Sequence, residues 1–213
     1  MRRLRNAVLA VVMTWPLAAM AETATVVALG DSLTAGYGLA PEQGFVPRLQ
    51  AWLDERGADV VVQNAGVSGD TTAGGLTRLD WALTPEADAV IVELGGNDFL
   101  RGLDPAVSRT NLRAILEKVR ARGLPVLLVG IDASGQYGPD YEATFDGMYP
   151  DLAREFGALL EPDFFAALRD GGRGLDEARA AYLQPDGIHP NPAGVDLVVG
   201  RIGPRVLELV GSQ

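Results

Sequence analysis

The sequence predicts a three-layer α/β/α sandwich built around a central parallel sheet. First, four short and nearly continuous apolar runs are typical of strands covered on both faces, at residues 24–29, 59–63, 89–94 and 125–131. Second, segments with helical periodicity alternate with these runs, and this alternation favours a parallel sheet. Third, the length of 213 residues fits one domain.

The helical segments carry apolar residues spaced three or four positions apart, which places them on one helix face. Three such faces are clear: Phe45, Val46, Leu49, Trp52 and Leu53; Leu112, Ile115, Leu116 and Val119; and Val195, Val198, Val199, Ile202, Val206 and Leu209. Gly57 and Gly123 follow the first two, where a C-terminal cap is expected. We also expect a helix over residues 71–83, a loop leading into a helix over 133–149, and little regular structure over 161–190.

The first 21 residues form a predicted signal peptide. Three arginines within the first five residues give a positive start, residues 7–15 are mostly apolar, and residues 19–21, Ala-Met-Ala, match a small-x-small cleavage site. The apolar stretch is shorter than the ~20 residues that a membrane span needs, which argues against an uncleaved anchor. We therefore expect one domain over residues 22–213, periplasmic or secreted, with no stable membrane span after cleavage.

Composition excludes several classes of chemistry. The chain has no cysteine, so disulfides, thiolate nucleophiles and cysteine zinc sites are ruled out. The formal net charge of −10 becomes −13 once the three leader arginines are removed, and such a surface repels nucleic acid. We expect a soluble monomer that acts without a metal or other cofactor.

Three small, polar, glycine-bearing segments follow the first three predicted strands. They are Gly-Asp-Ser-Leu at 30–33, Asn-Ala-Gly-Val-Ser-Gly-Asp at 64–70 and Gly-Gly-Asn-Asp at 95–98. Ordinary tight turns use the same residue types. In open α/β sheets, however, ligands bind outside the carboxyl ends of the strands, so three such segments at one edge favour a ligand site.

A fourth segment, residues 184–191, contains His189, the only histidine of the chain. Asp186 lies three residues earlier, close enough to hydrogen-bond the imidazole and fix its tautomer. The other imidazole nitrogen then remains for a nucleophile, which a serine hydroxyl becomes only when a base accepts its proton. A lone histidine is more often structural, but this one stands beside a proline in a predicted loop, a poor setting for a core role.

Together the four segments resemble the SGNH, or GDSL-type, hydrolase superfamily, whose blocks they match in order and spacing over residues 30–190. The details at residues 67–71, 93–98 and 137–145 are most similar to its periplasmic thioesterase I, arylesterase and lysophospholipase subgroup. The resemblance implies a flavodoxin-like fold and a serine esterase that hydrolyses aryl esters, acyl thioesters or lysophospholipids through an acyl-enzyme. It requires no cofactor and implies a small-molecule or lipid acyl ester as substrate.

The resemblance also implies residue roles. Ser32 attacks the acyl carbon, His189 acts as base and then acid, and Asp186 orients His189. The oxyanion hole consists of the backbone amides of Ser32 and Gly69 and the side-chain amide of Asn97. Beside these motifs, apolar residues suggest a groove for an acyl chain: Leu33, Leu100, Tyr137 and Ile188.

Other interpretations stay open at this point. Four aspartates at the same edge could bind magnesium in a phosphoester hydrolase, namely Asp31, Asp70, Asp98 and Asp186. We favour structural roles for Asp31, which could hold its turn through backbone hydrogen bonds, and for Asp98, which could brace its loop. Two further alternatives are an acetylesterase that acts on glycans and a non-catalytic acyl-binding protein on a hydrolase scaffold.

Overall fold

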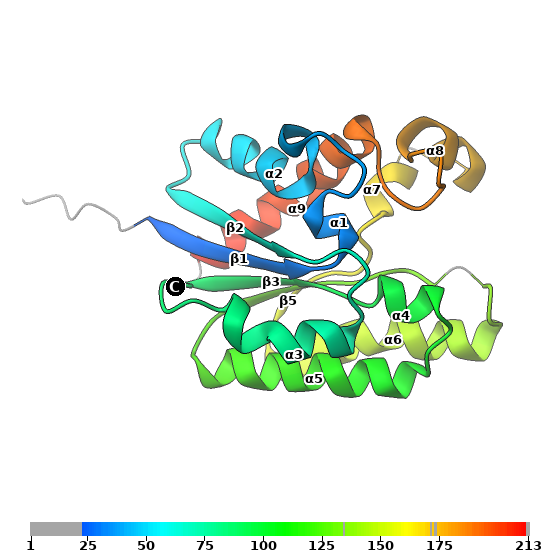
Figure 1. The fold of residues 1–213 in the computed structure, drawn as a ribbon, viewed down its shortest axis with the longest axis horizontal. Helices are drawn as coiled ribbons and strands as arrows, with labels where there is room; N and C mark the ends of the chain where they lie inside the picture. Colours follow the sequence, from blue (N-terminus) through cyan, green and yellow to red (C-terminus); the bar gives the residue numbers. More distant parts are fainter. Residues whose placement is uncertain (1–22, 134, 171, 173, 212–213) are drawn as a thin grey trace, which may run out of the picture.

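The computed structural model describes residues 23–133, 135–170, 172 and 174–211, and it contains a five-stranded parallel sheet of order β2-β1-β3-β4-β5 (Figure 1). The strands are β1 (Ala24–Gly30), β2 (Val60–Gly66), β3 (Ala89–Glu93), β4 (Val126–Val129) and β5 (Leu159–Glu161). Every residue of β3 and β4 is buried, which explains the unbroken apolar runs there. In register, Gly30 pairs with Gly66 on one side and Glu93 on the other.

Helices cover both faces of the sheet and complete the predicted three layers (Figure 1). One layer contains α1 (Ser32–Ala35), α2 (Phe45–Asp54) after the short 3₁₀ turn Pro41–Gln43, and α9 (Pro192–Gly211), with α7 (Ala166–Arg169) and α8 (Leu175–Tyr182) beyond them. The other contains α3 (Thr72–Ala82), α4 (Gly96–Leu100), α5 (Pro105–Ala121) and α6 (Pro139–Phe156).

The predicted helix faces form the core. Leu49 of α2, Leu112 of α5 and Val198 of α9 are fully buried. Helices α2 and α9 approach closely because position 203 is glycine: a Cβ there would lie 2.6 Å from the Trp52 ring. The predicted caps are also confirmed, since Gly57 and Gly123 adopt φ of 67° and 72° after α2 and α5.

The structure differs from the sequence prediction at four places. Strand β2 continues to Gly66, into a segment that we expected to be loop, because it follows β1 in register to its end. Strand β4 is shorter than predicted, and β5 was not predicted at all. Part of the region expected to be irregular forms α7 and α8.

The predicted signal peptide, residues 1–21, lies outside the described residues. Among the residues that the structure describes, no helix has the length and apolar character needed to cross a membrane.

The strand order creates a crevice at the carboxyl end of the sheet. From β1 the chain crosses to β2 at the edge, whereas from β3 it crosses to β4 in the opposite direction. The ends of β1 and β3 are therefore neighbours whose following loops diverge, which is where open α/β sheets bind ligands.

Candidate active site

A chain of hydrogen bonds joins Ser32, His189 and Asp186 across the crevice. His189 Nε2 lies 2.9 Å from Ser32 Oγ, and His189 Nδ1 lies 2.6 Å from Asp186 Oδ2. The second carboxylate oxygen of Asp186 accepts hydrogen bonds from the backbone N–H groups of Ile188 (2.9 Å) and His189 (3.1 Å). The structure thus brings together the three side chains that the sequence predicted to act together.

The electrostatics of Asp186 favour its ionised form. Burial alone would raise the pKa of this carboxyl, but the hydrogen bonds from the His189 side chain and from two backbone N–H groups outweigh it and lower the pKa below its ordinary value. A carboxylate that stays ionised fixes the proton of His189 on Nδ1 and leaves Nε2 as an acceptor facing Ser32.

Ser32 is placed by the junction of β1 and α1. Asp31 ends the strand and caps the helix, with its Oδ1 accepting from the backbone N–H of Leu33 at 3.0 Å. Ser32 is the first residue of α1, where a backbone N–H has no partner within the helix. No described residue accepts a hydrogen bond from that N–H, so it is available to a ligand.

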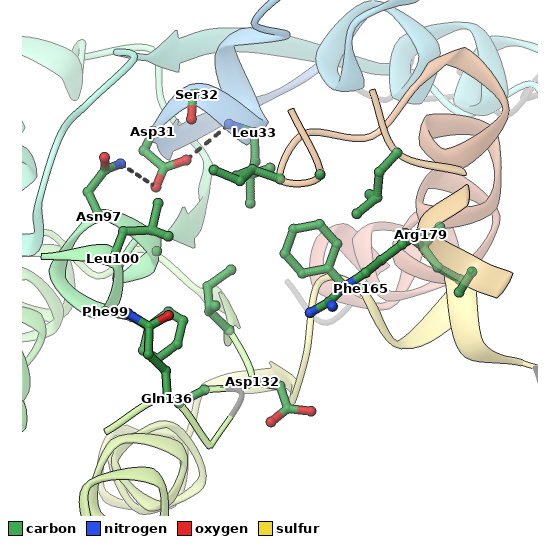
Figure 2. Close-up of a pocket in the computed structure, with 18 of the residues that line it drawn as sticks. Asp31, Ser32, Leu33, Asn97, Phe99, Leu100, Asp132, Gln136, Phe165 and Arg179 are labelled. Atoms are coloured by element: carbon green, nitrogen blue, oxygen red, sulfur yellow. Dashed lines mark hydrogen bonds between the residues drawn. The ribbon is translucent and has the colours of Figure 1, made fainter. Parts of the chain in front are cut away.

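Asp31 also links the turn that carries Ser32 to Asn97. Its Oδ2 accepts a hydrogen bond of 3.0 Å from Asn97 Nδ2, shown as a dashed line in Figure 2. A side-chain amide has two N–H groups, and this bond occupies one of them while it fixes the amide's orientation. The predicted structural role of Asp31 is confirmed by its bond to Leu33, and the link to Asn97 adds to it.

A second buried acid, Glu93, lies beneath this turn. Its Oε2 accepts from Thr34 Oγ1 at 2.8 Å. Burial raises the pKa of Glu93 well above its ordinary value, and the charge of Asp31 raises it further. Burial also raises the pKa of Asp31, to about 6, against the lowering effect of hydrogen bonds from Leu33 and Asn97. Burial and the neighbouring charge of Asp31 thus both favour the protonated form of Glu93.

Gly69 occupies a tight turn between β2 and α3. The N–H of Asp70 donates to the carbonyl of Val67 at 3.1 Å, and Gly69 adopts a φ of 86°, which L-residues rarely tolerate. Arg101, at the end of α4, donates to the Gly69 carbonyl at 2.7 Å. The N–H of Gly69 has no acceptor among the described residues, so this amide is also free for a ligand.

Asp98 braces the loops around the site, as predicted. It is fully buried, and its carboxylate accepts hydrogen bonds from the Thr72 N–H (2.8 Å), Thr72 Oγ1 (2.6 Å) and Ser108 Oγ (2.8 Å). It thereby fastens the start of α3 and the first turn of α5 to α4.

The four aspartates of the magnesium alternative do not form one site. The Asp98 carboxylate already accepts hydrogen bonds from Thr72 and Ser108. Asp70 forms an ion pair with Arg78 at 2.5 Å, and Asp186 is hydrogen-bonded to His189. Within the described ranges, the acidic side chains close enough to share an ion are Asp132, Glu142 and Asp146, none of which belongs to that set.

A cavity of about 480 Å³ opens beside Ser32. Three of the four apolar residues expected at an acyl-chain groove lie in its wall, namely Leu33, Leu100 and Ile188. Tyr137 does not: it packs edge-on against Phe99, which does line the cavity, with the ring centroids 5.7 Å apart. Tyr137 therefore contacts a residue of the wall without lining the cavity itself.

Several residues of the site were not predicted. Figure 2 shows Phe165 and Arg179 on the side of the cavity opposite Asn97, and Asp132 and Gln136 at another edge. A fifth, Tyr37, contacts His189 outside the cavity. Phe165 and Arg179 come from the region without clear periodicity, and no local motif in the sequence indicates any of the five.

Comparison with known proteins shows which family the chain belongs to. A model of the GDSL-like lipase/acylhydrolase family matches residues 28–197. The chain is 40% identical to esterase TesA of Pseudomonas aeruginosa over 91% of this chain and 93% of that protein. It is 38% identical to thioesterase 1/protease 1/lysophospholipase L1 of Escherichia coli K12, over 78% and 76% of the two chains.

A solved structure supports the same assignment. The crystal structure of the psychrotrophic esterase EstA from Pseudoalteromonas, inhibited by monoethylphosphonate, matches with a TM-score of 0.79 and 32% identity, over 88% of this chain and 98% of that one. The range that the family model matches, residues 28–197, includes all four segments of the site. The chain therefore belongs to the GDSL-like lipase/acylhydrolase family, as its sequence motifs predicted.

Proposed function

We propose that this protein is a serine hydrolase of carboxylic esters and thioesters that works through an acyl-enzyme on Ser32. One observation carries the proposal: a single imidazole bonds Ser32 Oγ through one nitrogen and Asp186 through the other, at 2.9 and 2.6 Å. Relatives named as an esterase and as a thioesterase and lysophospholipase support the same reaction class.

Each half of the reaction moves one proton through His189. As Ser32 Oγ attacks the acyl carbon, its proton passes to His189 Nε2. The imidazolium then protonates the departing alkoxide or thiolate, the bond to the leaving group breaks, and the acyl group remains on Ser32. In the second half, water attacks the acyl-enzyme while His189 Nε2 accepts its proton. His189 then returns the proton to Ser32 Oγ, and the carboxylic acid is released. Asp186 keeps its negative charge throughout and stabilises the imidazolium.

Three neutral donors would stabilise the negative oxygen of each tetrahedral intermediate. They are the N–H groups of Ser32 and Gly69 and the free N–H of the Asn97 side chain. The backbone donors are supported by their lack of other acceptors among the described residues. The amide of Asn97 is held by Asp31 and so needs little reorganisation when charge develops.

The cavity favours a longer acyl chain over an acetyl group. Its wall beside Ser32 includes Leu33, Leu100 and Ile188, with Phe99 and Phe165 further along. An acetyl group would leave most of about 480 Å³ unfilled, whereas a longer chain would bury apolar surface at ~25 cal/mol per Å². We therefore propose aryl esters, acyl thioesters and lysophospholipids as substrates, ahead of acetylated glycans.

We further propose that residues 1–21 direct export and that the remaining domain acts in the periplasm or outside the cell, as a monomer and without a cofactor. The positive, apolar and small-residue order of the leader supports export. The acidic surface supports solubility and disfavours nucleic acid.

Covalent labelling tests the mechanism. A fluorophosphonate probe should modify the protein once, on Ser32, because only an activated serine displaces fluoride from phosphorus. Ser32→Ala should be neither labelled nor active while it keeps the wild-type unfolding temperature. A probe that fails to label the folded wild-type protein would favour the non-catalytic acyl-binding alternative.

A further inference from the structure

The ring of Tyr37 lies against the imidazole of His189. The two ring centroids are 4.7 Å apart and the planes are inclined by 40°. Tyr37 is 53% exposed and the His189 side chain only 14%, so the tyrosine is the more exposed of the two contacting rings. Tyr37 is not part of the cavity wall, which separates it from the residues placed to contact an acyl chain.

The backbone holds Tyr37 at a fixed position relative to both partners. Its N–H donates to the carbonyl of Ser32 at 3.0 Å, across the turn at Gly36. Its carbonyl accepts from Gln184 Nε2 at 2.8 Å, and the same amide donates to the carbonyl of Pro190 at 2.9 Å. The N–H of Gln184 donates to the carbonyl of His189 at 2.7 Å. These bonds connect the serine turn, Tyr37 and the histidine loop.

We propose that Tyr37 is a positioning residue that holds the His189 ring in line with Ser32 Oγ. The inference rests on the proposed function, because it takes His189 as the base. Asp186 bonds one corner of the imidazole, and the ring could still tilt about that bond, since the terminal torsion of histidine is broad. Tyr37 blocks the tilt toward solvent. Its face also attracts the imidazolium that forms when His189 accepts the serine proton.

Substitutions at position 37 distinguish an effect of the aromatic ring from an effect of any apolar side chain at that position. Tyr37→Phe keeps the ring and removes only the hydroxyl, whereas Tyr37→Leu keeps an apolar side chain and removes the aromatic face. Trp81→Leu is the matched control, because Trp81 is an 83% exposed aromatic side chain on α3, away from the site. Each variant is tested as untagged protein for its unfolding temperature, for kcat and KM on p-nitrophenyl butyrate, and by NMR.

The single histidine makes the NMR readout specific, because every imidazole signal of untagged protein belongs to His189. We expect Tyr37→Leu to shift the imidazole carbon-bound proton signals by removing the tyrosine ring current. We also expect kcat to fall about tenfold, a part of the ~10²–10⁴-fold contribution of a placed general base. KM and the unfolding temperature should stay near wild type, and Tyr37→Phe and Trp81→Leu should match wild type throughout.

Two results would overturn the inference. Wild-type kcat in Tyr37→Leu would show that the ring does no positioning, and a change confined to KM would make Tyr37 a substrate contact instead. Failure of the proposed function is distinguishable from both, because the wild-type protein itself would then resist fluorophosphonate labelling. Should Tyr37→Leu unfold, the comparison of Tyr37→Phe with Tyr37→Met supplies the same contrast of ring against apolar cover.

Discussion

Asp31 connects two groups that the proposed mechanism uses together, the turn that carries Ser32 and the side-chain amide of Asn97. The connection uses both carboxylate oxygens, one for the N–H of Leu33 and one for the side chain of Asn97. An asparagine at position 31 has a single acceptor oxygen and would turn an amide toward the amide of Asn97. One of the two bonds is therefore lost in Asp31→Asn, although the side chain keeps its shape.

The raised pKa of Asp31 has a consequence for stability. Burial is its main cause and brings the pKa from 3.8 to about 6, so the folded state binds this proton more tightly than the unfolded state. The contribution to stability is complete at pH below 3.8 and is lost as the pH rises toward and through about 6. We expect the difference in unfolding free energy, wild type minus Asp31→Asn, to decrease over that window in urea titrations. Parallel pH curves for the two proteins would contradict this.

Asn97→Ala tests the oxyanion assignment at the level of one side chain. Removing a preorganised donor typically lowers turnover by ~10²–10³-fold. Since the donor acts on charge that exists only in the transition state, kcat should fall while KM stays within about twofold. Steady-state kinetics on a p-nitrophenyl ester decides it: an effect on KM alone would show that Asn97 binds substrate rather than the oxyanion.

At the scale of elements, Asp98 fastens α3 and α5 to the short helix that carries Asn97. Asp98→Ala would leave the donors of Thr72 and Ser108 buried without an acceptor, at about 1–3 kcal/mol each. We expect a loss of about 3 kcal/mol in unfolding free energy by urea titration. Glu117→Ala, an exposed substitution on α5, is the control and should change little. Equal stability of the two variants would refute the bracing role.

The elements also show where sequence patterns suffice. Strands β3 and β4 and the long helices were predictable because a buried strand or an amphipathic helix repeats one signal over many residues. Strand β5 has only three residues, Leu159–Glu161. Its apolar residues continue the pattern of α6 before it, so the sequence does not mark it as a separate strand. Gly66 looked like a loop residue, yet it extends β2 because its partner Gly30 ends β1.

At the scale of the whole molecule, the parallel sheet assembles the site. Ser32, Gly69 and Asn97 follow three adjacent strands, and His189 precedes the last helix, so four distant segments meet at one edge. Motifs within each segment made that meeting predictable. Tyr37 and Phe165 were not predictable. The contact of Tyr37 with His189 and the place of Phe165 in the cavity wall depend on tertiary packing, which leaves no local pattern in the sequence.

The central claim is that Ser32, with His189, hydrolyses esters whose acyl chain lies in the cavity. The most direct measurement is turnover of p-nitrophenyl esters from acetyl to palmitoyl, by wild type and Ser32→Ala, each with EDTA present. We predict metal-independent turnover that is highest at medium or long chains and is abolished in Ser32→Ala. Turnover that persists in Ser32→Ala, or that EDTA removes, would contradict the serine mechanism, and a maximum at acetyl would contradict the acyl-chain cavity.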